Sequence, residues 1–187
     1  MRMTRTPPRE QAMAARLGRA LLVSLCLLCS GAAWPANIYS NDFRLTNDEA
    51  QPVKLSAFSG RTVVMSMEYS RCRFMCTSTF TKLKEIRAVA DRNNIPLDIV
   101  VVSLDPANDT PAEWREYRRM RDLSGNHWHL LTPRPQDMPR IAQLLGIRYW
   151  YVGENLVHDF RLVRISAQGE TIAEMNNYDG DALRFLR

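Results

Sequence analysis

The segment DIVVVSL, residues 98–104, is apolar at almost every position and rich in β-branched side chains. A strand with one face in water alternates polar and apolar residues, whereas a continuous apolar run is typical of a strand buried on both faces. Such strands belong to parallel sheets, because the crossover connections between parallel neighbours place helices on both sides. The segment therefore predicts an α/β domain.

Helical patterns lie on either side of this strand. Before it, apolar residues recur at helical spacing over residues 80–90. After it, residues 108–120 open with a capping box, in which Thr110 caps the helix, Pro111 takes the first position and Glu113 the third.

The remaining segments complete an alternation of strands and helices. The predictions are two short strands joined by a polar turn (42–58), two strands (61–69 and 127–132), a helix ended by Gly146 (137–146), a β-hairpin (156–166 with 170–175) and a short closing helix (181–186). This order of elements indicates an α/β sandwich around a mixed sheet.

Two cysteines, Cys72 and Cys76, come directly after the strand predicted over residues 61–69 and lead into the next helix. A cysteine pair at such a junction is the thioredoxin-like arrangement. We therefore expect residues 37–187 to form one thioredoxin-like sandwich, with an N-terminal strand extension and a C-terminal hairpin plus short helix.

The spacing of the two cysteines bears on their chemistry. Positions four residues apart lie on the same face of a helix, so the sulfurs can converge at its start. The helix N-terminus and the neighbouring Arg71 and Arg73 favour thiolates. Two convergent thiolates suit a soft ion such as Cu(I), while the oxidised pair would form a local disulfide. Thioredoxin-type sites have two intervening residues, and the three found here fit a metal better.

The first 36 residues have the layout of a secretory signal. Arginines precede an apolar run over residues 20–33, which leads into small residues suited to cleavage. The run of 14 residues is shorter than the stretch of about 20 that a spanning helix needs. We expect residues 1–36 to be a signal peptide or, as the alternative, a membrane tether through residues 20–33. The protein is then periplasmic, secreted or tethered to the inner membrane.

The leader also explains the basic composition. Five arginines and one acidic residue in residues 1–36 account for four of the five net positive charges. The body is nearly neutral, so we expect no nucleic-acid partner. Cys26 and Cys29 are lost with a cleaved leader, which leaves Cys72 and Cys76 in an oxidising compartment.

Three stretches of the chain carry a combined pattern. They are a glycine-led strand with a tyrosine and C-x-x-x-C (FSGRTVVMSMEYSRCRFMC, 58–76), a strand ending in Asp-Pro and running on to Asp-Thr-Pro (VVSLDPANDTPAEWREY, 101–117) and a histidine before a strand and a glycine turn (VHDFRLVRISAQG, 157–169). Together they resemble the Sco/SenC family of copper-handling proteins with a thioredoxin fold, over residues 43–175.

The resemblance implies a copper site made of Cys72, Cys76 and His158. Thiolates hold Cu(I), and an imidazole lets the site also accept Cu(II). Without the resemblance, His158 reads as a strand-end histidine bonded to the backbone.

The resemblance also implies a metallochaperone, which delivers copper by ligand exchange and without turnover. The acceptor would be the copper-bearing subunit of cytochrome c oxidase or another copper carrier. The alternative is a thiol–disulfide oxidoreductase or redox sensor, in which Cys72 attacks and Cys76 resolves. Both functions need reduced cysteines in an oxidising compartment, and so imply a thioredoxin-like reductant.

The sequence departs from the family pattern around the cysteines. Thr77 stands where the family usually has proline, and residues 73–75 include an arginine where acidic or neutral residues are common. A cation there opposes metal binding and activates a thiolate, which keeps the redox alternative open. Glu68 replaces a small residue, and we interpret it as a strand-end carboxylate paired with Arg71 or Arg73.

Two further histidines, His127 and His129, flank Trp128 at strand spacing and so share one face. They could chelate an ion together, but we interpret them as polar residues at a strand end.

Overall fold

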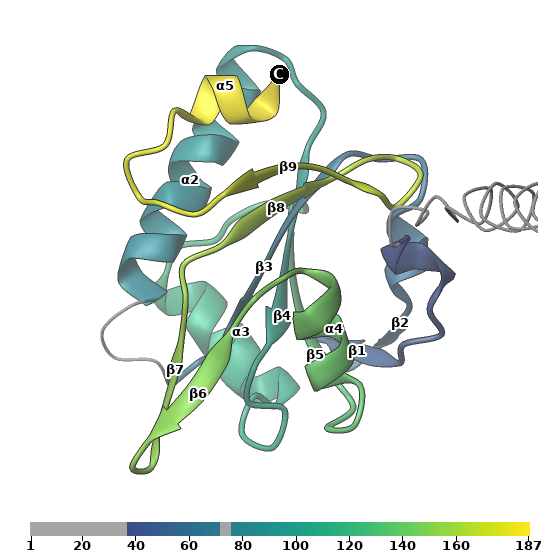
Figure 1. Cartoon of the computed structure of the whole chain (residues 1–187), viewed down its shortest axis with the longest axis vertical. Helices are drawn as coiled ribbons and strands as arrows, with labels where there is room; N and C mark the ends of the chain where they lie inside the picture. The colour runs from purple at the N-terminus through teal and green to yellow at the C-terminus, as the bar shows by residue number, and fades with distance from the viewer. Residues whose placement is uncertain (1–36, 72–75) are drawn as a thin grey trace, which may run out of the picture. The chain divides into compact units, whose positions relative to one another are not determined.

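Within residues 37–71 and 76–187, which the computed structural model describes, seven strands form one mixed sheet (Figure 1). For Cys76 and Thr77 the description covers the backbone. The order across the sheet is β2–β1–β5–β4–β3–β8–β9. These strands are β1 (Leu45–Asn47), β2 (Pro52–Val53), β3 (Val63–Glu68), β4 (Asp98–Ser103), β5 (Trp128–Pro133), β8 (Leu162–Ile165) and β9 (Thr171–Met175). A separate hairpin consists of β6 (Tyr149–Val152) and β7 (Asn155–His158).

The central strands β3, β4 and β5 run parallel, and the outer strands pair antiparallel. Glu68, the last residue of β3, lies opposite Ser103, the last residue of β4. Because parallel strands end at the same edge of a sheet, the segments that follow β3 and β4 meet there, the usual location of a site in an α/β fold. Asp98 begins β4 and therefore lies at the opposite edge.

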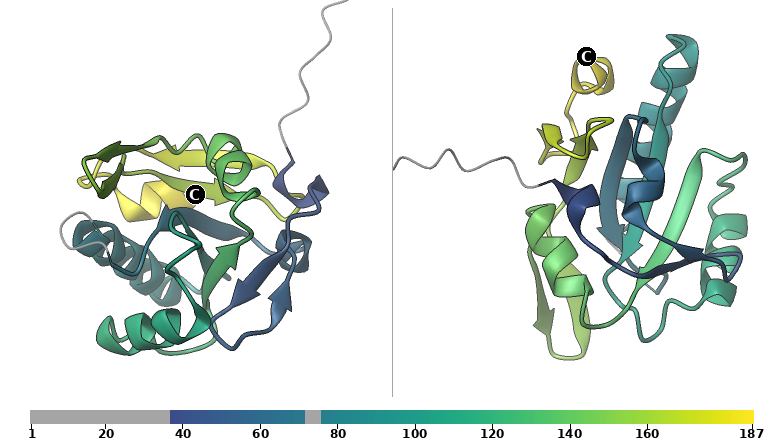
Figure 2. Two further views of the ribbon diagram at one scale, coloured as in Figure 1. Left: turned by 90° about the horizontal axis from the view of Figure 1, so that it is seen from below. Right: turned by 90° about the vertical axis from the view of Figure 1, so that its right-hand side faces the viewer.

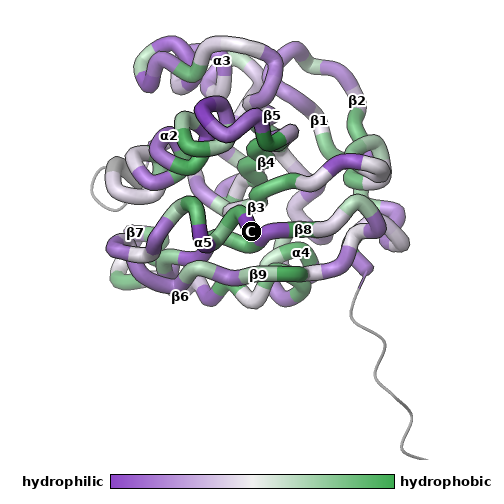
Figure 3. Tube along the Cα trace, turned by 90° about the horizontal axis from the view of Figure 1, so that it is seen from above, coloured by the Kyte–Doolittle hydropathy of each residue, from purple (hydrophilic) through white to green (hydrophobic). Residues whose placement is uncertain are grey.

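Helices cover both faces of the sheet, as the two views of Figure 2 show. One face carries α2 (Cys76–Arg92), α3 (Pro111–Met120) and α5 (Ala182–Leu186), and the other carries α4 (Met138–Leu144) with the 3₁₀ turns η1 (Ile38–Ser40) and η2 (Leu55–Phe58). Every residue of β3 and β4 is buried. Figure 3 shows their hydrophobic stretches between the helical layers, so the predicted α/β sandwich is confirmed.

The signals predicted at the two helix termini are confirmed, except for one half of the capping box. Thr110 Oγ1 accepts a hydrogen bond from the Glu113 N–H at 3.2 Å, and Pro111 is the first residue of α3. The Thr110 N–H donates to the Asn108 carbonyl, however, so the Glu113 carboxylate does not complete the capping box. Gly146 follows α4 with a φ of 64°, which a residue without a Cβ adopts freely.

The prediction of one continuous strand over residues 156–166 is wrong, because the structure has two separate strands there. Residues up to His158 belong to β7, which pairs with β6, and β8 starts at Leu162 to pair with β3 and β9. The break follows from contacts with Arg148: the Asp159 N–H donates to its carbonyl, and the Asp159 carboxylate accepts from its N–H.

Among the described residues, no helix combines the length and the apolar character needed to cross a bilayer. The leader expected over residues 1–36 lies outside the described residues, so its function stays a prediction.

Candidate metal centre

The cysteine motif spans the junction between β3 and α2. Cys76 is the first residue of α2, while Cys72 lies outside the described residues. The backbone N–H groups of a first helical turn have no partners inside the helix, and they stabilise negative charge nearby. This placement agrees with the helix start that the sequence predicts for the motif.

His158 ends β7 and is buried, with 2% of its surface exposed. Its Nδ1 lies 3.0 Å from the carbonyl oxygen of Asp159. A carbonyl can only accept, so Nδ1 carries the proton of this bond and Nε2 is left to accept a proton or bind a metal. The backbone bond foreseen for a structural histidine is therefore present, and it also orients the ring as in a metal ligand.

Glu68 lies against this free nitrogen. Its Oε2 is 3.5 Å from Nε2 of His158, and only 1% of the residue is exposed. The separation exceeds the usual 2.7–3.2 Å of an N–H···O bond, and neither Glu68 oxygen has a hydrogen-bond partner among the described residues. The pairing predicted for Glu68 was with Arg71 or Arg73. Arg71 pairs instead with Glu113 at 3.9 Å on the surface, so that half of the prediction is wrong, while Arg73 lies outside the described residues.

The electrostatics of the pair follow from burial and contact. Burial alone would lower the pKa of His158, but the Glu68 carboxylate and the Asp159 carbonyl outweigh it and raise that pKa above its usual value. The protonated imidazole is thus stabilised by the carboxylate beside it. A metal ion on Nε2 would replace this proton and occupy the same side of the ring.

A hydrogen bond and a ring contact of Tyr69 hold the strand end that leads into the motif. Tyr69 donates from its hydroxyl to the carbonyl oxygen of Leu156 at 2.6 Å, and its ring meets His158 edge-on with centroids 6.1 Å apart. Burial, followed by the charges of Glu68 and two aspartates, raises the pKa of the Tyr69 phenol, which keeps it a neutral donor.

Asp109, in the loop between β4 and α3, anchors the next residue of this segment. Its Oδ1 accepts from the Ser70 N–H at 2.9 Å and from the Ser70 hydroxyl at 2.6 Å, and its Oδ2 accepts from the Ser103 hydroxyl. Burial raises the pKa of Asp109 despite these hydrogen bonds. Three segments distant in sequence thus converge where the motif begins.

The histidines His127 and His129 lie at the opposite edge of the sheet. Both approach Oδ1 of Asp98, at 3.2 Å and 3.4 Å, while Arg61 holds Oδ2 at 2.6 Å. No set of three or more His, Cys, Asp or Glu residues within the described part of the chain has the arrangement of a metal site. Their interpretation as polar strand-end residues agrees with these contacts.

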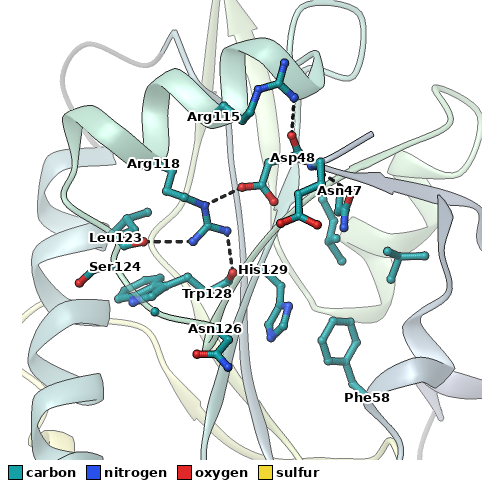
Figure 4. Close-up of a pocket in the computed structure, with 14 residues that line it drawn as sticks. Asn47, Asp48, Phe58, Arg115, Arg118, Leu123, Ser124, Asn126, Trp128 and His129 are labelled. Carbon is teal, nitrogen blue, oxygen red and sulfur yellow. Dashed lines mark hydrogen bonds and ion pairs between the residues drawn. The ribbon is translucent and has the colours of Figure 1, made fainter. Parts of the chain in front are cut away.

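A pocket lies beside β1, β5 and α3, and several polar side chains that line it bond to neighbouring groups of the protein (Figure 4). Arg118 donates from Nε to Asp48 Oδ2 at 2.6 Å and from its other nitrogens to the carbonyls of Leu123 and Trp128. Arg115 donates to the Asp48 carbonyl at 2.7 Å. These hydrogen bonds pair the polar groups with one another and connect α3 to β1 and β5. We therefore interpret the pocket as a structural contact between these elements.

Sequence reasoning missed Glu68 as a neighbour of His158. The signal that could have found it is the replacement of a small family residue by a carboxylate at the end of a buried strand. A charge at such a position needs a buried partner.

Comparisons with known proteins agree with this arrangement. The sequence profile described as SCO1/SenC matches residues 32–178. The SCO1 protein homolog of Bacillus subtilis (strain 168) is 24% identical over 103 residues, which are 55% of this chain and 53% of that protein. The chain thus spans about half the length of the curated relatives that it matches.

Solved structures share the fold. The structure of Arabidopsis thaliana ScoI with copper bound has a TM-score of 0.67 and 18% identity, over 77% of this chain and 90% of that one. The structure of BsSco has a TM-score of 0.64 and 18% identity, over 78% of this chain and 87% of that one. BsSco is described as having a disulfide switch and as a member of the Sco family of cytochrome c oxidase assembly proteins. The thioredoxin-like fold expected from the sequence is confirmed.

Proposed function

Because the chain belongs to the SCO1/SenC family, we propose that it binds one copper ion through Cys72, Cys76 and His158 and passes it to another protein. The observation that carries the proposal is the orientation of His158. Its Nδ1 is held by a backbone carbonyl, and its buried Nε2 has no hydrogen bond among the described residues. The Tyr69 hydroxyl connects the His158 hairpin to the segment that leads into Cys72.

The donor set fits copper in both oxidation states. Two cysteine thiolates are soft ligands that suit Cu(I), and a neutral imidazole adds the nitrogen that Cu(II) prefers. The start of α2 and the arginines around Cys72 favour the thiolate form that binding requires. Copper-bound Sco proteins of the same fold support this assignment.

The transfer that we propose is ligand exchange. Thiolates and imidazoles of an acceptor would replace the ligands of this chain one at a time, so no covalent product forms and no turnover is implied. The copper-bearing subunit of cytochrome c oxidase is the acceptor we favour, since BsSco is described as one of the cytochrome c oxidase assembly proteins. A thioredoxin-like protein would keep Cys72 and Cys76 reduced.

The site of action that we propose is the periplasmic side of a bacterial inner membrane. Residues 1–36 would act as a signal peptide or hold the domain through residues 20–33. A SCO1/SenC family lipoprotein of Bacillus anthracis supports attachment to a membrane.

A second candidate function is thiol–disulfide exchange by the same pair. Arg71 and Arg73 favour it, because a cation beside a thiolate promotes attack on a disulfide but opposes a bound metal. BsSco is described by a disulfide switch, which supports a reversible Cys72–Cys76 bond here.

Copper titration of the reduced full chain tests the proposal. We expect one equivalent to bind, with thiolate-to-copper absorption in the Cu(II) form, and Cys72→Ser or Cys76→Ser to remove most of the affinity. A double-serine variant that still binds one equivalent tightly would move the site elsewhere, and the region of His127 and His129 would be examined first.

A further inference from the structure

Glu68 is a buried carboxylate that the ligand set of two cysteines and a histidine leaves unexplained. It is 1% exposed, and neither of its oxygens has a hydrogen-bond partner among the described residues. Removing a carboxylate from water costs several kcal/mol unless a cation or hydrogen bonds compensate. Its ion pair in the described part of the chain is with His158, across 3.5 Å. The position therefore requires a positive charge next to Nε2 of His158.

The nitrogen that faces Glu68 is the one that a metal would use. Since Nδ1 is committed to the Asp159 carbonyl, Nε2 can carry either a proton or a metal ion. The observed 3.5 Å separation of Oε2 and Nε2 is too long for a good hydrogen bond, so neither atom is committed to the other.

The other carboxylates near the motif are already engaged. Both oxygens of Asp109 accept hydrogen bonds from Ser70 and Ser103, and both oxygens of Asp105 accept from the amide of Asn108. Of Glu68, Asp105 and Asp109, only Glu68 has carboxylate oxygens without a hydrogen-bond partner among the described residues, and it lies next to His158.

We propose that Glu68 is a fourth ligand of the copper ion, and that its oxygen makes the site of this chain selective for Cu(II). The inference rests on the copper site proposed above and extends it. A carboxylate is a hard ligand, so it stabilises Cu(II) more than Cu(I). It also adds a third negative charge to the two thiolates, and a divalent ion compensates that charge better than a monovalent one.

The test compares Glu68→Gln with the wild-type full chain. The amide is nearly the same size but has no charge and is a poor metal ligand. We expect Cu(II) affinity to fall by about 10- to 100-fold or more, since even outer partners of metal ligands contribute that much. The copper hyperfine splitting in electron paramagnetic resonance should change with the loss of the oxygen ligand, while Cu(I) affinity, measured by competition with a chelator, should change less than about threefold.

Glu113→Gln is the matched control. It makes the same chemical change on a half-exposed residue near the same edge of the sheet, where Glu113 faces Arg71 at 3.9 Å. We expect this variant to keep the Cu(II) affinity and the resonance spectrum of the wild type. Equal losses in both variants would mean that general charge matters and would overturn the assignment of Glu68.

A second measurement needs no variant. The infrared difference between the Cu(II) form and the metal-free form of the wild type should show a shifted carboxylate stretch, and its absence would overturn the proposal. If the wild type binds one Cu(II) through its cysteines while Glu68→Gln leaves affinity and spectrum unchanged, the inference fails and the copper site stands. If the wild type binds no copper, both fail.

Discussion

Tyr69 and Leu156, 87 residues apart in sequence, are joined by a hydrogen bond of 2.6 Å from the phenol to the backbone carbonyl. Tyr69 precedes Cys72 by three residues, and Leu156 precedes His158 by two. The bond therefore fixes the hairpin of β6 and β7 against the strand end from which the cysteine motif starts. Such a link would help the two proposed ligands, Cys72 and His158, to hold one ion although they lie far apart in sequence.

Tyr69→Phe should loosen this link without changing the core. The lost hydrogen bond is worth about 1 kcal/mol, and the same energy applied to the placement of His158 corresponds to about a fivefold loss of Cu(II) affinity. Thermal unfolding and Cu(II) competition measure the two effects. Tyr151→Phe is the control, because Tyr151 is an exposed residue of the same hairpin. A drop in stability with unchanged Cu(II) affinity would show that the hairpin is positioned by other contacts.

Asp109→Ala should be strongly destabilising. It removes three hydrogen bonds and leaves the Ser70 N–H and the Ser103 hydroxyl without their buried acceptor, a cost of about 2–4 kcal/mol. Denaturant unfolding measures the loss. Asp105→Ala is the comparison, since Asp105 is only partly buried and its carboxylate binds the amide of its loop neighbour Asn108. Equal losses in the two variants would argue against Asp109 as the anchor of the motif.

Local patterns in the sequence predicted most of the fold. The apolar run of β4, the Thr110 cap of α3 and Gly146 after α4 are signals that act within a few residues, and all three are confirmed. The β6–β7 hairpin was missed, although Gly153 with a φ of 61° divides two runs of β-forming residues. Residues 156–166 read as one continuous strand because Arg148, whose backbone binds Asp159 at the break, lies 11 residues away in sequence.

The candidate site was predictable only in part. The helix start at Cys76 follows from local pattern, whereas His158 came from the family resemblance. The contact between Glu68 and His158 joins residues 90 positions apart. Periodicity says which face of β3 a side chain occupies but not which segment covers that face, so the partner of Glu68 required the structure.

Asp98→Asn should lower stability in a pH-dependent way. Burial opposes the ionised form of Asp98, but contacts with His129, His127 and Arg61 outweigh it and hold its pKa below the usual value. A lowered pKa in the folded state means that the carboxylate stabilises the protein above the unfolded pKa of about 3.9, and that this contribution is lost as the pH falls through the folded value.

We therefore expect Asp98→Asn to reduce the free energy of unfolding by about 1–2 kcal/mol at pH 7, and the difference from wild type to shrink below about pH 4. Denaturant unfolding across this pH range measures both effects. Asp91→Asn serves as the control, because the exposed Asp91 pairs with Arg87 on the surface of α2 and should matter little. If the difference in free energy of unfolding between Asp98→Asn and the wild type stayed constant with pH, the altered packing of the side chain, and not its lost charge, would explain the lower stability.

His158→Ala separates the two candidate functions. Cu(I) is satisfied by two thiolates, so its affinity should fall only moderately, whereas Cu(II) prefers nitrogen and more ligands, so its coloured form should be nearly lost. The reduction potential of a dithiol depends on its two sulfurs and their local charges. The Cys72–Cys76 disulfide should therefore still form and be reduced in this variant. Absorption of the Cu(II) form and titration of the thiols measure the two properties.

His127→Ala is the matched control, because it removes an imidazole at the opposite edge of the sheet, where that ring contacts Asp98. It should keep full Cu(II) affinity. If His158→Ala kept it as well, Nε2 would not be a ligand, and the contact with Glu68 would be a buried ion pair of structural value only. Thiol–disulfide exchange would then become the better account of the motif, because that reaction needs nothing from His158.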